Sequence, residues 1–278
     1  MPIKSNIVRV RIAPSPTGSF HIGHARTALF NLLFARKHQG IFIVRIEDTD
    51  KARSQKKFEE DIFSSLEWLN LIPDEGPRSG GRYGPYRQSE RAAYYRETLE
   101  KLLKEGHAFW CFHTESEVEA EQSTFSQRKK NIAHRCSFRD LSPSEQKKMQ
   151  AEKKEAIIRF KTPPGRTIDF IDLIRGPINF DSDLLGDFSI ARDLTSVLYN
   201  LAVVVDDSAM AITHVIRGED HIPNTPKQIL LQEVLGLTTP QYAHLPLILG
   251  SGRAKLSSRH GALGIEEYRK QGYLPEAL

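Results

Sequence analysis

The first part of the chain alternates short apolar runs with polar, turn-rich segments. Residues 7–12 alternate apolar and basic side chains, which predicts a strand with one apolar face. Residues 22–38 predict an amphipathic helix that ends at Gly40, and its apolar stripe contains Ala28, Leu29, Leu32, Leu33 and Ala35. Residues 41–46 are almost all apolar, as in a strand covered on both faces. This strand–helix–strand order predicts a parallel sheet.

A second apolar region follows later in the chain. Residues 201–205 and 211–216 predict two further buried strands. Residues 226–235 then predict a helix, and residues 242–249 one more strand. We therefore expect the second region to complete the sheet that the first one begins.

Residues 115–154 separate the two apolar regions. They are rich in Glu, Gln, Lys and Ser, which predicts an inserted subdomain. Helices expected near residues 90–104 and 144–154 have surface-exposed patterns.

Composition sets broad limits. With 278 residues, 39% hydrophobic and 27% charged, the chain fits one large or two ordinary globular domains. No apolar run approaches the roughly 20 residues of a membrane span, and no secretory signal precedes the first strand, so we expect no membrane partner. Only two cysteines, Cys111 and Cys136, argue against a disulfide framework and favour the cytoplasm. The net charge of +4 is only weak support for a polyanionic partner.

Polar clusters follow the predicted strands. Arg11 precedes a Pro-Ser-Pro-Thr-Gly loop, and acidic or mixed clusters occupy residues 47–50, 206–207 and 217–221. Parallel sheets bind ligands beyond the carboxyl ends of their strands. Because arginines and acids alternate in these clusters, we predict a crevice for a zwitterionic ligand.

Two segments suit a nucleotide triphosphate. His21, Gly23 and His24 occupy a loop-to-helix junction, where backbone N–H groups and the helix dipole favour phosphate. Residues 253–259 form a basic loop with small hydroxyl residues that can stabilise phosphate charge. Alone, the histidines could be a metal pair or surface residues, and the loop a solvated surface.

Together, these segments resemble the His-Ile-Gly-His and Lys-Met-Ser-Lys-Ser elements of class I aminoacyl-tRNA synthetases. Further segments narrow the resemblance to the glutamyl-tRNA synthetase family, and it runs essentially end to end. These segments are residues 11–18 (RIAPSPTG), 25–31 (ARTALFN), 44–50 (VRIEDTD), 84–91 (GPYRQSER), 204–207 (VVDD), 214–221 (HVIRGEDH) and 273–278 (YLPEAL).

The resemblance implies an α/β fold, with a Rossmann-like parallel sheet split by a subdomain that binds the tRNA acceptor stem. We expect the catalytic halves at residues 1–106 and 188–278 and the insertion at residues 107–187. The anticodon-binding domain of the full-length enzymes has no counterpart, so a truncated chain or split gene is expected. We further expect a monomer.

The implied reaction has two steps. ATP and L-glutamate give glutamyl-adenylate, and the glutamyl group then passes to the 3′ end of tRNA-Glu. Use of tRNA-Gln stays open. Mg²⁺ would accompany the ATP. Two alternatives remain: a relative that glutamylates queuosine on tRNA, and a paralogue that binds tRNA or ligand without turnover.

The resemblance also implies roles for single residues. His21, His24, Lys255 and Arg259 would be catalytic. The implied ATP site is Gly23, Glu219, His221, Ile248, Lys255, Ser257, Ser258 and Arg259. The implied glutamate site is Arg11, Ser15, Glu47, Tyr199, Asn200, Val203 and Arg217. Arginine suits this task because its planar fork pairs a carboxylate bidentately. The alternative that Arg11 and Glu47 form only a salt bridge stays open.

Two departures from the family pattern bear on the chemistry. Ser258 stands where the basic loop normally carries its second lysine, and losing such a contact typically costs about 10²–10³ in rate. Some relatives hold a structural zinc in the insertion. Here Cys111, His113 and Cys136 are candidate ligands, but Phe138 replaces the fourth, and His134 has an unusual spacing. We therefore favour an ordinary core over a Zn²⁺ site.

Overall fold

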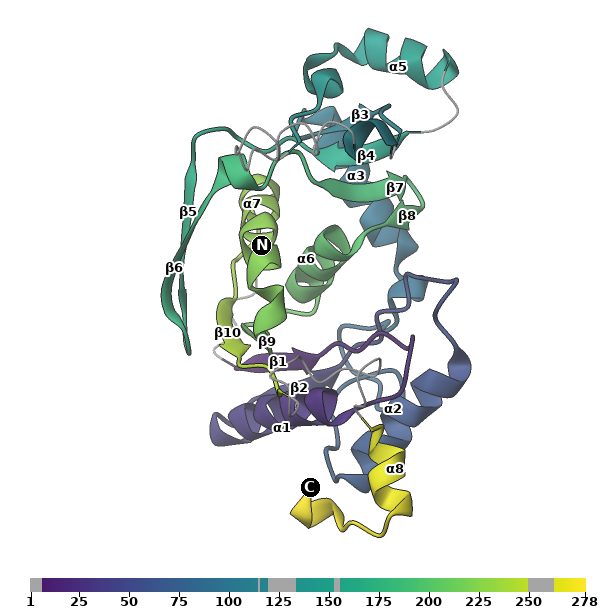
Figure 1. Ribbon diagram of the computed structural model, residues 1–278, viewed down its shortest axis with the longest axis vertical. Helices are drawn as coiled ribbons and strands as arrows, with labels where there is room; N and C mark the ends of the chain where they lie inside the picture. Colours follow the sequence, from purple (N-terminus) through teal and green to yellow (C-terminus); the bar gives the residue numbers. More distant parts are fainter. Residues whose placement is uncertain (1–6, 115, 120–133, 153–155, 250–262) are drawn as a thin grey trace.

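The computed structural model describes residues 7–114, 116–119, 134–152, 156–249 and 263–278. Figure 1 shows two parts, a lower body of strands and helices and an upper antiparallel sheet, joined by long helices. Within the described residues, no helix has both the length and the apolar character of a membrane span.

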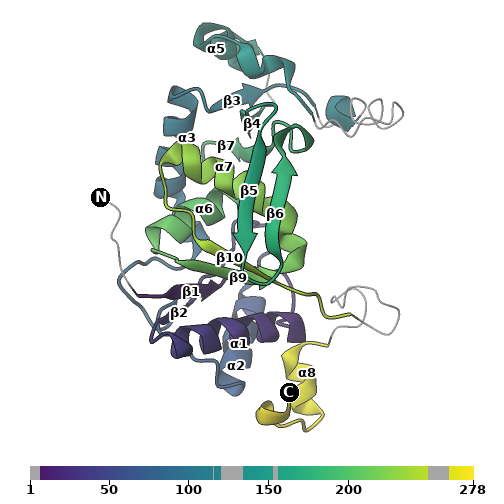
Figure 2. The ribbon, with the colours of Figure 1, turned by 90° about the vertical axis from the view of Figure 1, so that its left-hand side faces the viewer.

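The N-terminal region has the predicted strand–helix–strand order. Strand β1 (Arg9–Ile12) pairs in parallel with β2 (Ile41–Val44), and helix α1 (Ile22–Lys37) connects them. Helix α2 (Lys56–Trp68) follows and lies behind α1 in Figure 2.

The predicted apolar stripe of α1 is wrong in part. Alanines (Ala25, Ala28 and Ala35) occupy its buried face, whereas Leu29 and Leu33 are 41% and 56% exposed. Small side chains allow the helix to lie close to the strands, so the larger ones fall on the outer face.

The C-terminal region supplies the second parallel pair. Strand β9 (His214–Gly218) pairs in parallel with β10 (Gln241–Leu245), and helix α7 (Thr225–Leu235) connects them after a 3₁₀ segment, η4 (Glu219–Asn224). The predicted helix and both strands are confirmed, but β9 begins at His214 and β10 ends at Leu245. The Thr213 N–H donates to the Arg9 carbonyl at 2.9 Å, so β9 lies beside β1. Helix α8 (Ile265–Lys270) and η6 (Pro275–Ala277) end the chain.

One predicted strand is a helix. Residues 201–205 belong to α6 (Tyr199–Ala209), in which every residue from Leu201 to Asp207 is buried. A helix covered on all sides shows no polar face, so its apolar run carries no helical period. The acidic pair Asp206 and Asp207 therefore projects from a buried helix and does not follow a strand.

The segments on either side of the polar middle build a separate sheet. Antiparallel strands lie in the order β3 (Ala108–Cys111), β4 (Ile157–Phe160), β7 (Ser189–Asp193) and β8 (Ser196–Val197). The last two strands come after residue 187, where we expected the insertion to end. Helix α5 (Pro143–Glu152) lies above this sheet in Figure 1, with η2 (Ser137–Asp140) beside it.

Helix α3 (Ala92–Lys104), preceded by η1 (Gln88–Glu90), leads into this sheet. It was predicted to be surface-exposed, but it buries Tyr95, Leu99 and Leu102. These side chains belong to the larger hydrophobic core, which also includes much of α6. The prediction was wrong because the polar side chains of the helix hid a narrow apolar stripe.

A hairpin connects the insertion to the catalytic sheet. Strands β5 (Thr167–Asp172) and β6 (Gly176–Asp181) pair antiparallel, and η3 (Ser182–Leu184) follows. At its end, β5 also pairs in parallel with β10, through Asp172 and Tyr242. Figure 2 shows the hairpin running down from the insertion beside β10 and β9. One sheet, in the order β6-β5-β10-β9, therefore contains strands from both parts.

Candidate active site

A cleft of about 430 Å³ opens between the loop after β1, the start of α1 and the end of β9. Its size suits a small-molecule ligand. Ten of the predicted site residues line it: Arg11, Ser15, His21, Gly23, His24, Glu47, Tyr199, Arg217, His221 and Ile248. The polar ends of β1, β2 and β9 therefore meet as the parallel-sheet rule predicts.

Three further predicted residues lie outside the cleft. Val203 is buried in the core, and Asn200 accepts a hydrogen bond from the Gln228 amide at 3.1 Å. Glu219 accepts one from the Leu247 N–H at 2.8 Å and also contacts Arg175. None of these three lines the cleft. The predicted Lys255, Ser257, Ser258 and Arg259 fall outside the described residues.

His21 and His24 lie at the N-terminus of α1. His21 is its N-cap, and its Nδ1 accepts from the Gly23 N–H at 3.1 Å. The two imidazole rings stack with centroids 3.9 Å apart. A Cβ on Gly23 would come within 3.0 Å of the His21 ring, so glycine permits this packing. The junction thus combines two imidazoles with the positive end of a helix, a combination suited to anionic oxygens.

Arg217, on β9, enters the cleft from the opposite side. Its guanidinium donates to His244 Nε2 at 3.1 Å, to Thr225 Oγ1 at 2.8 Å and to the Tyr199 hydroxyl at 3.3 Å. All three partners accept without a formal negative charge. Arg217 is only 5% exposed, and no described carboxylate lies within salt-bridge distance of it. A buried cation without a counter-ion is costly, so this site favours an anionic ligand.

Arg11 and Glu47 belong to a buried charge cluster. Arg11 Nε donates to Asp207 at 3.0 Å, and Arg45 donates to Asp207 at 2.6 Å and to Glu47 at 3.0 Å. Burial would raise the pKa of Asp207, but Arg11 and Arg45 outweigh it and hold that pKa below the usual range. Burial raises the pKa of Glu47 in spite of Arg45. Arg11 and Glu47 thus pair with other residues, and the simple salt bridge between them is not what the structure shows.

Two charged residues of the cleft were missed. Arg26 and Asp220 both line it. Arg26 lies three residues after Gly23 on α1, hence on the same helix face, and that spacing was a usable signal. Asp220 lies within the acidic cluster after β9.

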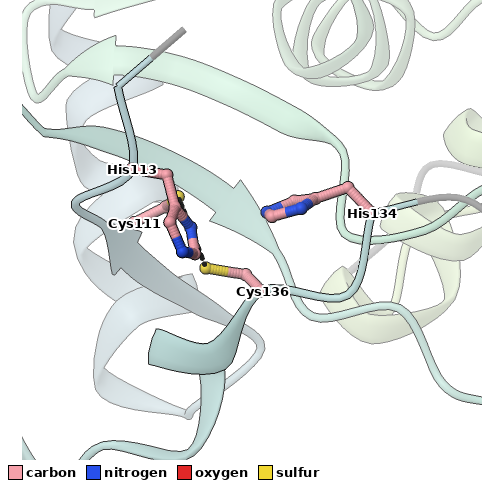
Figure 3. A group of neighbouring side chains, drawn as sticks. All are labelled: Cys111, His113, His134 and Cys136. Atoms are coloured by element: carbon pink, nitrogen blue, oxygen red, sulfur yellow. Dashed lines mark hydrogen bonds between the residues drawn. The ribbon is translucent and has the colours of Figure 1, made fainter. Parts of the chain in front are cut away.

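The insertion contains a second group of interest. The ligand atoms of Cys111, His113, His134 and Cys136 all lie within 4.8 Å of one another. Figure 3 shows the four side chains converging, with Cys111 and His113 on one segment and His134 and Cys136 on another. His113 Nδ1 lies 3.5 Å from Cys111 Sγ and 3.4 Å from Cys136 Sγ. A hydrogen bond from Cys136 lowers the pKa of the Cys111 thiol.

These donors fit a tetrahedral metal. Ligands at 2.0–2.3 Å from Zn²⁺ are about 3.5 Å apart, close to both measured contacts. The sequence prediction left a fourth ligand missing at Phe138, whose ring instead packs on His113 at 4.7 Å between centroids. The chain supplies His134 as the fourth donor, and the expectation of an incomplete set was wrong.

Comparison with known proteins identifies the fold family. The family described as "tRNA synthetases class I (E and Q), catalytic domain" matches residues 7–278. The chain belongs to this family.

Relatives within this synthetase family agree with the match. The chain is 52% identical over 272 residues to the glutamate–tRNA ligase of Carboxydothermus hydrogenoformans, covering 98% of this chain and 57% of that protein. It is 53% identical over 273 residues to that of Aquifex aeolicus, covering 98% and 55%.

Among solved structures, a glutamate tRNA ligase from Elizabethkingia meningosepticum in complex with its amino acid is similar, with a TM-score of 0.87 and 40% identity. The match covers 97% of this chain and 59% of that one. The Rossmann-like synthetase architecture is thereby confirmed, and the chain spans somewhat over half the length of these relatives.

Proposed function

We propose that this chain activates L-glutamate with ATP and transfers the glutamyl group to the 3′ end of tRNA-Glu. The glutamate assignment rests on the surroundings of Arg217. This arginine is buried at the cleft, and its hydrogen-bond partners are all uncharged. A substrate carboxylate would supply the missing counter-ion, and the guanidinium fork would pair it bidentately. The names of the relatives support the same amino acid.

The rest of the cleft accommodates the other groups of glutamate and ATP. Glu47, on the wall beside Arg11, suits the ammonium, while Arg11 itself suits the second carboxylate. His21 and His24 would hold phosphate oxygens at the start of α1, with Mg²⁺ accompanying the nucleotide. Attack of the carboxylate on the α-phosphate needs alignment and charge stabilisation, which these fixed donors provide.

Glutamate-dependent exchange between pyrophosphate and ATP, measured with and without tRNA-Glu, tests this proposal. We expect exchange that requires glutamate and is stimulated by tRNA-Glu, followed by charging of tRNA-Glu. Activation that is independent of tRNA and ends on queuosine would support the tRNA-modifying alternative. No adenylate under any condition would support the binding-only alternative.

The basic loop allows a sharper version of this test. Ser258 leaves the loop one cation short of the family pattern. We expect Ser258→Lys to speed adenylate formation, by up to the roughly 10²–10³ that one such contact contributes. An unchanged single-turnover rate would mean that Lys255, Arg253 or Arg259 already supplies the charge.

We also propose that Cys111, His113, His134 and Cys136 bind one Zn²⁺. When bound, the ion would tie the end of β3 to the segment before η2 and so stabilise the insertion. The four ligands come from two short segments that are far apart in the chain. A structural role follows from this, because the group lies in the insertion sheet and includes none of the cleft residues.

Elemental analysis of protein purified without chelator tests the zinc site. We expect about one zinc per chain, removal of which lowers the melting temperature. His134→Ala should lose the metal, whereas His107→Ala, in the turn before β3, should retain it. Metal-free protein whose melting temperature does not respond to added zinc would contradict the proposal.

A further inference from the structure

We infer that Asp172 and His244 are positioning residues that fix the Arg217 guanidinium for a substrate carboxylate. The inference rests on the proposed role of Arg217 and adds two residues that do not line the cleft. One of them, Asp172, comes from the hairpin of the insertion, and the other, His244, from β10.

The three residues form a continuous buried chain. The His244 Nδ1 lies 2.6 Å from Asp172 Oδ2, and both side chains are completely buried. On the other edge of the ring, His244 Nε2 lies 3.1 Å from Arg217 Nε. Imidazole therefore bridges a carboxylate and the cation that faces the cleft.

The hydrogen-bond donors fix one tautomer. Arg217 Nε always carries a proton, so His244 Nε2 must accept. The ring proton then sits on Nδ1 and is donated to Asp172. A charged ring would place two N–H groups against each other, and burial together with Arg217 lowers the pKa of His244 accordingly. The neutral ring thus holds Arg217 in place without neutralising it.

Asp172 is committed at both oxygens. Its Oδ1 accepts from the backbone N–H groups of Ile174 and Arg175, each at 2.9 Å, and of His244 at 3.2 Å. Its Oδ2 accepts from the His244 ring. Every partner of the Asp172 carboxylate is a donor. The NH₂ group of an amide at this position would therefore face another donor, either the His244 ring or the backbone N–H groups. The NH₂ group would face the ring at the lower free-energy cost. Imidazole can move its proton to the other ring nitrogen, whereas the three backbone N–H groups cannot give up theirs.

Asp172→Asn is therefore the decisive variant. Its amide would donate to Nδ1, which moves the ring proton to Nε2 and against Arg217 Nε. We expect the KM for glutamate to rise roughly 10- to 100-fold, with little change in the KM for ATP. The ¹⁵N shifts of the imidazole, read without any substrate, should switch from the Nδ1–H to the Nε2–H pattern. Asp169→Asn, an exposed position on the same strand, serves as the control.

Two variants of His244 separate positioning from simple packing. The Oε1 atom in His244→Gln can still accept from Arg217, whereas His244→Leu offers no acceptor. We expect the glutamate KM of His244→Gln to lie between those of the wild type and His244→Leu, at similar stability. These variants also test the inference if Asp172→Asn fails to fold.

Distinct results overturn the inference and the proposed function. A wild-type ring in the Nε2–H form, or glutamate KM values within twofold of wild type for folded Asp172→Asn and His244→Leu, would overturn the positioning role. If the wild type shows no glutamate-dependent exchange at all, the proposed function fails. The ring shifts then still decide whether His244 accepts from Arg217.

Discussion

Arg45 and Arg217 are both buried arginines near the same cleft, but their surroundings are opposite. Arg45 lies 2.6 Å from Asp207, 3.0 Å from Glu47 and 3.8 Å from Asp206. These carboxylates outweigh the effect of burial and raise its pKa. Where Arg45 contacts carboxylates, Arg217 donates to the uncharged side chains of His244, Thr225 and Tyr199.

The two arginines differ in whether described carboxylates balance their charge. Around Arg45, the cations Arg11, Arg45 and Arg91 pair with the anions Glu47, Asp206 and Asp207, although Arg11 and Glu47 also line the cleft. Arg217 has no carboxylate within salt-bridge distance among the described residues, and we propose that a ligand balances its charge. Burial alone would not have distinguished the two.

Removal of Arg45 should have the largest effect. Arg45→Met leaves Glu47 buried without its arginine partner and Asp207 with Arg11 alone, so we expect the free energy of unfolding to fall by about 3–5 kcal/mol. Urea denaturation measures it. Arg96→Met is the control, because Arg96 and Glu100 form an exposed pair worth at most about 1 kcal/mol. Equal losses for both variants would remove the distinction between the two arginines.

Arg217→Lys should affect substrate use more than stability. Lysine keeps the charge but loses the planar fork, so we expect the kcat/KM for glutamate to fall by about 1.5–3 kcal/mol, roughly 10- to 150-fold. The free energy of unfolding should change far less than in Arg45→Met. Steady-state pyrophosphate exchange at varied glutamate measures the first, and urea denaturation the second. Kinetics that match the wild type would place the carboxylate elsewhere.

The smallest effect is a pH dependence from the neutral shell around Arg217. Burial, followed by Arg217 itself, lowers the pKa of His221 from 6.5 to about 4. Between these values the unfolded chain binds more protons than the folded one, so stability falls as the pH falls through this window. The low pKa of Asp207 confines its own contribution to more acidic pH.

Urea denaturation of the substrate-free protein between pH 7 and pH 4 measures this dependence. We expect a shallower pH slope for His221→Asn than for the wild type, with His107→Asn as the reference variant. A wild-type slope in His221→Asn would show that the group is not buried as a neutral ring.

Most of the cleft could be predicted from the sequence, because many of its polar residues lie at or directly after the carboxyl ends of β1, β2 and β9. It failed at α6, where a buried helix and a buried strand have the same apolar composition. Because of that error, the position of Asp206 and Asp207 on a helix was not predicted. Their carboxylates accept hydrogen bonds from Arg11, Arg45, Arg91 and Tyr95. The error did not change the residues expected at the cleft.

Two other features could not be predicted from the sequence. His134 lies 21 residues after His113, and only the fold brings it to the cysteines. The neutral partners of Arg217 come from α6, α7 and β10, so its missing counter-ion is a property of three-dimensional contacts. In both cases the residue types were visible, but their juxtaposition was not.

The pairing of β5 with β10 limits which insertions can replace the one in this chain. The insertion looks like a separable module, yet its strand β5 places Asp172 against His244, the partner of Arg217, through a single point of pairing with β10. A chimera that receives the insertion of a relative would inherit that relative's residue at this position. Recombination at the apparent module boundary should therefore succeed only where the donor brings an equivalent carboxylate.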